Sequence, residues 1–525
     1  MKKHQESHTG SLLASWFNFK FRLLAGGVTV GLLSGAAVVL YRYSLETALS
    51  AAHSVYSFER THVWLIPLWF IVLILGGWVT GLLVKKHPMI AGSGIPQVKG
   101  VLKGKLEMNW WRVFLAKFAG GTLSIGAGLS LGREGPSIQI GASIAQGFSK
   151  VLGKMKTEEN FLITCGASAG LAAAFNAPIA GVIFALEELH SSFSPFIMMS
   201  ALAASLAADF VSKEFFGLGP IFHFTGLGAV PLSQYAHLLG LGAVVGCMGI
   251  GFNGALYKFQ NLYRRLPVRQ EFKPVLPFLL AGLLGLVMPR VLGGGNDLVN
   301  ELMSGHFTIT ALFILLAVKF FFTLLSFGSS APGGIFLPML VLGSISGGLY
   351  TQIVNGLAGY PALETGRFLI LAMAGYLTAS VKAPITGIIL ITEMTGSFTS
   401  LLSTGIVCLT AYTVAEIFRS RPVYEVLLER ITSRGAAAEP EAPAGKSVME
   451  IPVHPGSSLD GLRIKEFSWP PHCLIVSIRR GELELIPGGE ARLQGGDYLV
   501  ILTDHRYASD IRDRLTDAAS DCSAV

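Results

Sequence analysis

The sequence is short of charged residues. Asp, Glu, Lys and Arg together make up 14% of the 525 residues, whereas apolar residues make up 51%. Soluble proteins carry about 25% charged residues, and a soluble globule of this size could not cover its surface with so few. A disordered chain would need low hydrophobicity and high net charge. The composition therefore excludes both classes and indicates a polytopic membrane protein.

Motifs for metal, nucleotide and hydrolytic chemistry are also missing. The five cysteines form no CxxC pair, and the 12 histidines form no HExxH motif, so no disulfide framework or metal site is indicated. No GxxxxGK[ST] motif occurs, which disfavours ATP-driven transport. The GxSxG match at 128–132 lies in an apolar run with no strand before it. We expect no enzyme activity, no cofactor and no metal.

The net charge of +7 does not indicate a nucleic-acid partner, because basic residues gather at the cytoplasmic ends of membrane spans. Lys2, Lys3, Lys20 and Arg22 precede the first apolar run, and Lys85 and Lys86 follow the second. Further basic groups occur at 264–273 and 419–434. We therefore expect both termini to be cytoplasmic.

What the sequence does contain is a series of long apolar runs, many of them interrupted by Gly or Pro. A spanning helix needs about 20 residues. Runs longer than this fit tilted helices or helices that stop within the membrane, and broken helices are tolerated where they line a cavity or are buried in protein. The runs lie at about 23–48, 64–84, 112–131, 161–186, 195–211, 236–257, 275–292, 308–327, 335–358, 367–396 and 402–418.

Composition also suggests where the domains end. Residues 1–20 form a cytoplasmic segment, and 21–431 form the membrane domain. The Pro- and Ala-containing stretch 432–447 is typical of a linker. Beyond it, 448–525 contains short β-rich runs at 473–487 and 497–504, separated by Gly pairs. The last segment is therefore expected to be a small soluble domain.

The membrane region contains an internal repeat. NAPIAGVIFALEEL (176–189) matches KAPITGIILITEMT (382–395) at an offset of 206, and Gly132, Pro136 and Gly141 recur at an offset of 202 as Gly334, Pro338 and Gly343. Two matches at nearly one offset favour duplication over chance similarity. The two halves are expected at about 21–220 and 235–431, with a substrate site at their interface near the midplane.

Three Gly-rich segments interrupt the apolar sequence, at 91–100, 132–142 and 331–339. Gly followed by Pro is typical of a helix start. Helix N-termini carry free N–H groups and partial positive charge, so several that converge in the membrane would bind an anion. The alternative is that the glycines only allow helices to pack closely.

These segments carry a resemblance to a known family. GSGIP (92–96), GREGP (132–136), GGIFLP (333–338) and the duplicated NAPIAG and KAPITG resemble the CLC chloride channels and proton–chloride exchangers, over roughly residues 20–430. The resemblance implies an all-α polytopic fold of tilted and broken helices in two inverted halves. It also implies a homodimer with one anion pathway per subunit, in a bacterial inner membrane.

The resemblance assigns roles to individual residues. Ser93 and Tyr424 would offer hydroxyls to a central chloride, and the amides of Ile335 and Phe336 would complete the site, with Gly94, Gly132 and Gly334 shaping the helix N-termini. Glu134 would be the gating carboxylate that competes with chloride. An acid in an apolar stretch is itself a functional candidate. Alternatively, Glu134 simply pairs with its neighbour Arg133.

Glu187 and Glu188 separate a structural from a functional role. Glu187 has a repeat partner, Glu393, so a packing or hydrogen-bonding role is expected for both. Glu188 aligns with Met394 and breaks the symmetry. In the family, this second position is the internal proton-accepting glutamate of exchangers. The sequence thus favours a proton-coupled chloride antiporter, with a passive voltage- or pH-gated chloride channel as the alternative. A membrane-embedded protease would need a Ser–His or paired-Asp site, which we do not find.

The C-terminal segment resembles the TrkA-C module through IVSIRRGELELIPGGEARLQGGDYLVIL (475–502). The resemblance implies a small α/β domain. Binding of an unidentified small ligand and ligand-free dimerisation both remain open for this domain.

Overall fold

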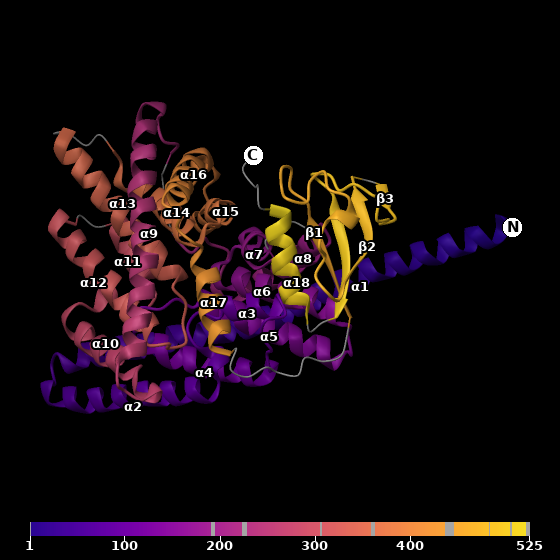
Figure 1. The fold of residues 1–525 in the computed structure, drawn as a ribbon. Helices are drawn as coiled ribbons and strands as arrows, with labels where there is room; N and C mark the ends of the chain where they lie inside the picture. The colour runs from indigo at the N-terminus through magenta and orange to yellow at the C-terminus, as the bar shows by residue number, and fades with distance from the viewer. Residues whose placement is uncertain are drawn as a thin grey trace. The chain divides into compact units, whose positions relative to one another are not determined.

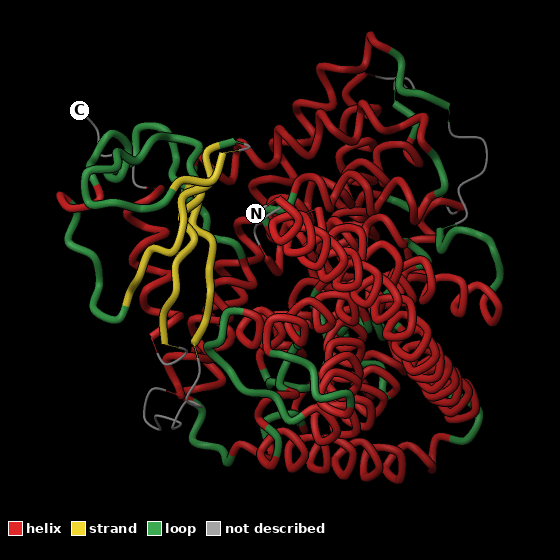
Figure 2. The backbone as a smooth tube through the Cα atoms, turned by 90° about the vertical axis from the view of Figure 1, so that its right-hand side faces the viewer, coloured by secondary structure: helices red, strands yellow, loops and turns green. Residues whose placement is uncertain are grey.

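The computed structural model describes residues 2–190, 195–222, 228–304, 307–358, 363–435, 446–481, 483–504 and 507–520. The chain forms two compact units, one of Met1–Leu102 and Met108–Glu429, the other of Lys103–Glu107 and Arg430–Val525. Helices build the first unit, whereas the strands belong to the second (Figure 1; Figure 2).

Helices make up most of the described chain up to residue 435. In chain order they are α1 (Lys2–Glu59), α2 (Ile66–Lys86), α3 (Ile95–Leu102), α4 (Trp110–Gly126), α5 (Glu134–Val151), α6 (Lys156–Phe175), α7 (Pro178–Phe184), α8 (Pro195–Phe216), α9 (Tyr235–Arg265), α10 (Val275–Val287), α11 (Asn296–Ser304), α12 (Ile309–Gly328), α13 (Phe336–Ala358), α14 (Thr365–Val381), α15 (Pro384–Thr395), α16 (Leu401–Ile417) and α17 (Val423–Gly435). A π-helix, η3 (Ala185–His190), follows α7 directly.

Seven helical segments of the described residues are long and apolar enough to cross a membrane. They are Phe21–Glu59, Val63–Lys86, Leu232–Arg265, Gln270–Val287, Ile309–Gly328, Phe336–Ala358 and Phe398–Ile417. Several shorter helices are buried between them. The residues of α14, for example, are buried from Phe368 to Val381. The expected polytopic helical fold is confirmed.

Two of the long apolar runs are broken at equivalent places. The run at 161–186 divides into α6 and α7, and the run at 367–396 divides into α14 and α15. Asn176 and Lys382 end the first helix of each pair in the left-handed conformation, with φ of 50° and 64°. Pro178 and Pro384 then begin the next helix. Because proline cannot continue a helix but suits its first turn, the NAP and KAP triplets explain both breaks.

The internal repeat is visible in the packing. α5 packs against α6, and the corresponding α13 packs against α14. Gly141 in α5 approaches Gly166 of α6 so closely that a Cβ there would lie 2.1 Å from the Gly166 carbonyl oxygen. At Gly343, the repeat partner in α13, a Cβ would lie 2.7 Å from the Ala372 carbonyl oxygen. At this position the glycines serve close helix packing.

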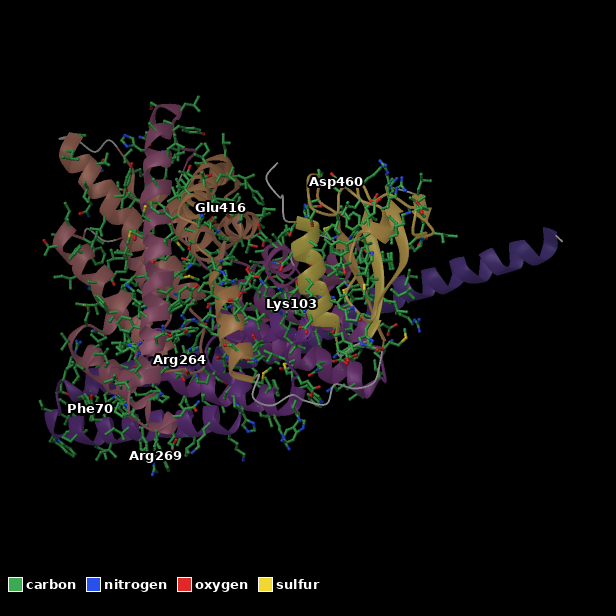
Figure 3. The ribbon with its side chains drawn as sticks, viewed as in Figure 1. Phe70, Lys103, Arg264, Arg269, Glu416 and Asp460 are labelled. Atoms are coloured by element: carbon green, nitrogen blue, oxygen red, sulfur yellow. The ribbon has the colours of Figure 1, made fainter. Side chains whose placement is uncertain are left out.

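Two basic loops lie on the same side of the first unit. Lys85, at the end of α2, pairs with Glu271 in the loop between α9 and α10, at 3.4 Å. Arg264 and Arg269 belong to that loop region (Figure 3). The two loops that the charge pattern assigns to one face are therefore in contact. Their cytoplasmic location, and that of both termini, stays a prediction.

The second unit contains a four-stranded antiparallel sheet in the order β1-β4-β2-β3. The strands are β1 (Lys446–Pro452), β2 (Cys473–Arg480), β3 (Leu483–Leu485) and β4 (Tyr498–Asp504), followed by helix α18 (Ala508–Ser520). Side chains of β4 alternate between exposed and buried, as expected for a sheet covered on one face. Its core includes Met449, Ile451, Leu499, Ile501, Ile511 and Leu515.

The predicted domain borders differ slightly from these elements. α17 continues to Gly435 and β1 begins at Lys446, so helix and strand both extend into the stretch expected as a linker. The remainder of that stretch, 436–445, lies outside the described residues, as do 521–525. Residues 2–20, expected as a separate segment, continue the backbone of α1.

Candidate anion site

The three Gly-rich segments meet in the first unit. Gly132 and Gly334 pair their backbones in both directions, each amide donating to the other's carbonyl oxygen at 2.7 Å. The Gly333 amide donates to the Gly92 carbonyl oxygen at 3.0 Å. Segments 202 and 241 residues apart in the chain are thereby joined backbone to backbone, and the first and second halves of the repeat meet at Gly132 and Gly334.

Each segment contains a helix N-terminus, as the sequence predicts. α3 begins at Ile95, α5 at Glu134 and α13 at Phe336. The first turn of a helix has amides without intrahelical partners and carries partial positive charge. Ile335 and Phe336 are completely buried at the start of α13, and the Phe336 ring packs against Phe175 and Phe184. The junction is therefore electropositive and largely shielded from solvent.

Three predicted side chains present polar groups at this junction. The hydroxyls of Ser93 and Tyr424 and the carboxylate of Glu134 are buried and have no hydrogen-bond partner among the described residues. The Ser93 hydroxyl lies against Gly135 in the first turn of α5. Tyr424, at the start of α17, lies near Ser93 and interacts electrostatically with Glu134. Because unpartnered buried polar groups are rare and costly, their convergence makes this junction a candidate ligand site.

Gly132 makes room for the Glu134 carboxylate. A Cβ at position 132 would lie 2.2 Å from Glu134 Oε2. It would also lie 3.1 Å from the Leu337 Cβ and 3.2 Å from the Leu337 amide nitrogen. Any larger residue would have to displace the carboxylate or the start of α13. The glycine is thus required by close approach at the junction, in addition to any role in helix packing.

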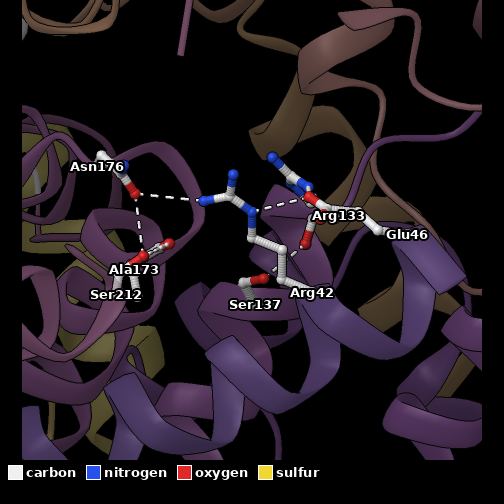
Figure 4. Close-up of polar contacts among 7 residues, drawn as sticks. All are labelled: Arg42, Glu46, Arg133, Ser137, Ala173, Asn176 and Ser212. Carbon is white, nitrogen blue, oxygen red and sulfur yellow. Dashed lines mark hydrogen bonds and ion pairs between the residues drawn. The ribbon is translucent and has the colours of Figure 1, made fainter. Parts of the chain in front are cut away.

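Arg133 does not pair with Glu134. Its Nη1 donates to Glu46 Oε1 of α1 at 2.7 Å, and Glu46 also accepts from Arg42 at 2.9 Å (Figure 4). Arg42 donates further to the Asn176 side chain at 3.3 Å. This network connects α1 to the end of α6 and leaves the Glu134 carboxylate without a paired cation among the described residues.

Glu187 takes part in a reciprocal contact between the two halves of the repeat. Its carboxylate accepts hydrogen bonds from the Ile385 and Thr386 amides, at 3.2 and 2.7 Å, in the first turn of α15. Glu393 accepts from the Ile179 and Ala180 amides, at 3.1 and 2.7 Å, in the first turn of α7. Each acid caps the helix of the other half. The structural role predicted for both residues is confirmed by these contacts.

We expect Glu187→Ala and Glu393→Ala to destabilise the protein by similar amounts, about 1 kcal/mol each, because each removes a helix cap. Thermal unfolding of the purified protein in detergent would measure the loss. A stability loss confined to one of the two variants would contradict the reciprocal capping.

Glu188 has different partners from its neighbour Glu187, because adjacent residues of a helix point in different directions. It is buried, and its Oε1 accepts from Lys99 Nζ of α3 at 2.9 Å. It also interacts electrostatically with the phenol of Tyr424. Tyr424 thus lies within electrostatic range of two buried carboxylates, those of Glu134 and Glu188.

Sequence reasoning missed three buried lysines. Besides Lys99, Lys117 donates to the Ile90 and Gly92 carbonyl oxygens at 2.9 and 2.6 Å. Lys319 donates in the same way to the Val291 and Gly293 carbonyl oxygens, at 2.9 and 2.7 Å. Both are completely buried and lie at the repeat offset of 202. The sequence could have revealed Lys117 and Lys319, because each is a charged residue in an apolar run and the two are separated by the repeat offset.

Two family models match the chain. The model described as voltage gated chloride channel matches residues 76–416, and the TrkA-C domain model matches residues 448–516. Among curated proteins, the H(+)/Cl(-) exchange transporter ClcA of Salmonella paratyphi B is 34% identical over 439 residues, covering 81% of this chain and 93% of the relative. The protein of the same name from Salmonella typhi matches equally well.

Solved structures show the same fold. A slow cyanobacterial Cl-/H+ antiporter superposes with a TM-score of 0.75 at 33% identity, covering 79% of this chain and 99% of that one. A CLC-type fluoride/proton antiporter superposes with a TM-score of 0.64 at 24% identity, covering 75% of this chain and 95% of that one, which supports the fold alone. These matches assign a membrane transport protein rather than an enzyme. The chain belongs to the CLC family of chloride channels and transporters and carries a C-terminal TrkA-C domain.

Proposed function

We propose that the protein is a proton-coupled antiporter that moves chloride across the membrane in exchange for protons. The observation that carries this proposal is the pair of buried carboxylates, Glu134 and Glu188, which both lie within electrostatic range of Tyr424. An anion route needs no second acid. A proton route does, because backbone amides and hydroxyls cannot store a proton between the two sides of a membrane.

The anion would bind among the Ser93 and Tyr424 hydroxyls and the amides of Ile335 and Phe336. Hydroxyl and amide donors stabilise an anion through charge-assisted hydrogen bonds, but hold it less tightly than a fixed cation would. Gly94, Gly132 and Gly334 let the backbones of the three segments approach one another. The buried amino groups of Lys117 and Lys319 each donate to two loop carbonyls and so hold these loops in place.

Glu134 would be the gate. It stands at the start of α5, where the positive helix end and the unpaired donors favour a negative charge. Its own carboxylate therefore competes with chloride for this place. Protonation removes the negative charge and so favours its replacement by an anion. The same group thereby couples proton binding to chloride entry.

Glu188 would accept the proton on the inner side. It is buried and has no acidic counterpart in the second half, where Met394 stands. The proton and anion paths would then share Glu134 and part beyond it.

The substrate is proposed to be chloride rather than fluoride. Similar proteins are named for two different transported anions. The antiporters at 33–34% identity are named for chloride, and the antiporter at 24% identity is named for fluoride. The serine hydroxyl of GSGIP favours the chloride assignment, because the fluoride-exporting branch carries methionine at this position.

A passive chloride channel of the same fold is the alternative. The two are separated by the reversal potential in liposomes under opposed chloride and proton gradients. An antiporter reverses at a potential set by both gradients, whereas a channel reverses at the chloride potential alone.

We further propose a homodimer in a bacterial inner membrane, with both termini cytoplasmic. The TrkA-C domain would then lie in the cytoplasm, where it either binds a small ligand or contributes to dimer contacts.

Removing the hydroxyls of the site should weaken chloride binding. Ser93→Ala with Tyr424→Phe removes two donors to a charged ligand, each worth about 1.5–3 kcal/mol, so chloride affinity should fall at least tenfold. Titration calorimetry with chloride measures the change. Tyr376→Phe removes another buried, unpartnered hydroxyl, in α14, and should leave affinity unchanged. Equal affinity in the double variant and the wild type would place the anion elsewhere.

A further inference from the structure

The contact between Lys99 and Glu188 is a buried ion pair. Lys99 Nζ and Glu188 Oε1 are 2.9 Å apart, and each side chain is 5% exposed. The pair joins two elements, α3 and the π-helix η3. Transport by the proposed mechanism does not require Lys99, and the sequence motifs do not single it out. Nevertheless it is the group that directly contacts the proposed proton acceptor.

A buried ion pair resists the loss of either charge. Breaking such a pair by neutralising one partner leaves the other charge buried without compensation, which is strongly unfavourable. Protonation of Glu188 has this effect, because it leaves the Lys99 ammonium alone. While Lys99 is charged, it therefore favours the ionised form of Glu188.

The surroundings contain few groups that could compensate Lys99 when Glu188 is protonated. Glu187 and Glu425 act electrostatically on Glu188, and Tyr424 lies nearby. Glu187 is already engaged by the first turn of α15. His190, on the same π-helix, forms a hydrogen bond with Thr164 at 2.6 Å. The negative charge that enters and leaves during a transport cycle is the anion itself.

The helix α3 connects Lys99 to the anion site. The helix begins at Ile95, two residues after Ser93, and Lys99 lies about 6 Å along the axis from Ile95 at 1.5 Å per residue, so Ser93 and Lys99 are on the order of 10 Å apart. At this distance, in surroundings of low polarity, an anion at Ser93 and the Lys99 ammonium attract one another appreciably. A bound anion would therefore partly compensate Lys99 and make protonation of Glu188 easier.

We propose that Lys99 is a positioning residue for proton transfer, which holds Glu188 ionised until an anion occupies the site at Ser93. This inference rests on the proposed function, because it assumes that Glu188 carries the inner proton. It adds a route by which chloride occupancy favours proton uptake, separate from the competition at Glu134.

The test is the pH dependence of chloride-driven proton flux in liposomes that contain Lys99→Met. Without the ammonium, the protonated form of Glu188 is favoured. The midpoint of the proton flux should then move by about 1–3 pH units toward higher pH, which is the typical effect of one close opposite charge. The flux should also depend less on chloride concentration. Lys99→Arg keeps the positive charge and should restore the wild-type midpoint.

Two further variants serve as controls. Lys85→Met removes a lysine from another ion pair of the same unit, that with Glu271, and should keep the wild-type midpoint. Lys99→Met combined with Glu188→Gln should behave as Glu188→Gln alone, because Lys99 acts through Glu188. Chloride flux in each variant reports whether the protein is folded.

The results distinguish a failure of the proposed function from a failure of the role proposed for Lys99. Proton pumping that survives in Glu188→Gln would contradict the proposed function itself. Loss of coupling in Glu188→Gln together with an unchanged midpoint in Lys99→Met would overturn only the role of Lys99. The role of Lys99 would also be overturned if Lys99→Met and Lys99→Arg lost chloride flux and proton flux equally and kept the wild-type midpoint of the proton flux. Lys99 would then have a structural role.

Discussion

Glu134→Gln is expected to conduct chloride with almost no dependence on pH and to move no protons in exchange. Glutamine has nearly the shape of a protonated glutamate but cannot ionise. It therefore cannot compete with chloride as an anion at the start of α5, and it cannot carry a proton. The largest change should be in proton flux, which falls from the coupled rate to background, whereas chloride flux persists.

Chloride and proton fluxes recorded from the same liposomes at several pH values measure both effects. Glu59→Gln is a matched control, because Glu59 is another buried carboxylate without a hydrogen-bond partner among the described residues, at the end of α1. It should behave as the wild type. Coupled proton flux in Glu134→Gln at the wild-type rate would show that the gate lies elsewhere.

Glu188→Gln should also abolish proton flux, but by a different route. The outer carboxylate at Glu134 remains intact, so chloride movement should persist and should keep its dependence on pH. Loss of the inner acid leaves the proton without an acceptor beyond Glu134. The contrast between a pH-independent and a pH-dependent chloride flux distinguishes the two variants.

Glu187→Gln provides the comparison for Glu188→Gln, because it changes the adjacent residue by the same chemistry. Its effect should fall on the cap of α15, where the carboxylate accepts from Thr386, and coupling should change less. Full proton coupling in Glu188→Gln, or its complete loss in Glu187→Gln alone, would reverse the assignment of the two acids.

Sequence patterns predicted the fold and the convergence of the Gly-rich segments because their causes are local. Proline after Asn176-Ala177 and after Lys382-Ala383 must interrupt a helix wherever it occurs. Gly and Pro at the start of an apolar run likewise mark a helix N-terminus. The duplication then implies that the two sets of N-termini face each other, as the paired backbones of Gly132 and Gly334 do.

Contacts between distant elements could not be predicted in this way. The partner of Arg133 is Glu46, which lies 87 residues earlier, and nothing in the local sequence favours it over the adjacent Glu134. The Lys99–Glu188 pair joins residues 89 positions apart. Both depend on how α1, α3 and η3 pack, which is set by the shapes of many side chains together. The short β-rich runs at 473–487 and 497–504 predicted β2, β3 and β4, whereas β1 was not predicted.

The most direct test of the account is chloride-driven proton uptake by the wild-type protein in liposomes. With chloride loaded on one side and no initial pH difference, the outflow of chloride should drive protons uphill in the opposite direction, and the proton gradient should collapse on addition of a protonophore. Chloride outflow of normal size with no accompanying proton uptake would contradict the antiporter assignment and leave a chloride channel in its place.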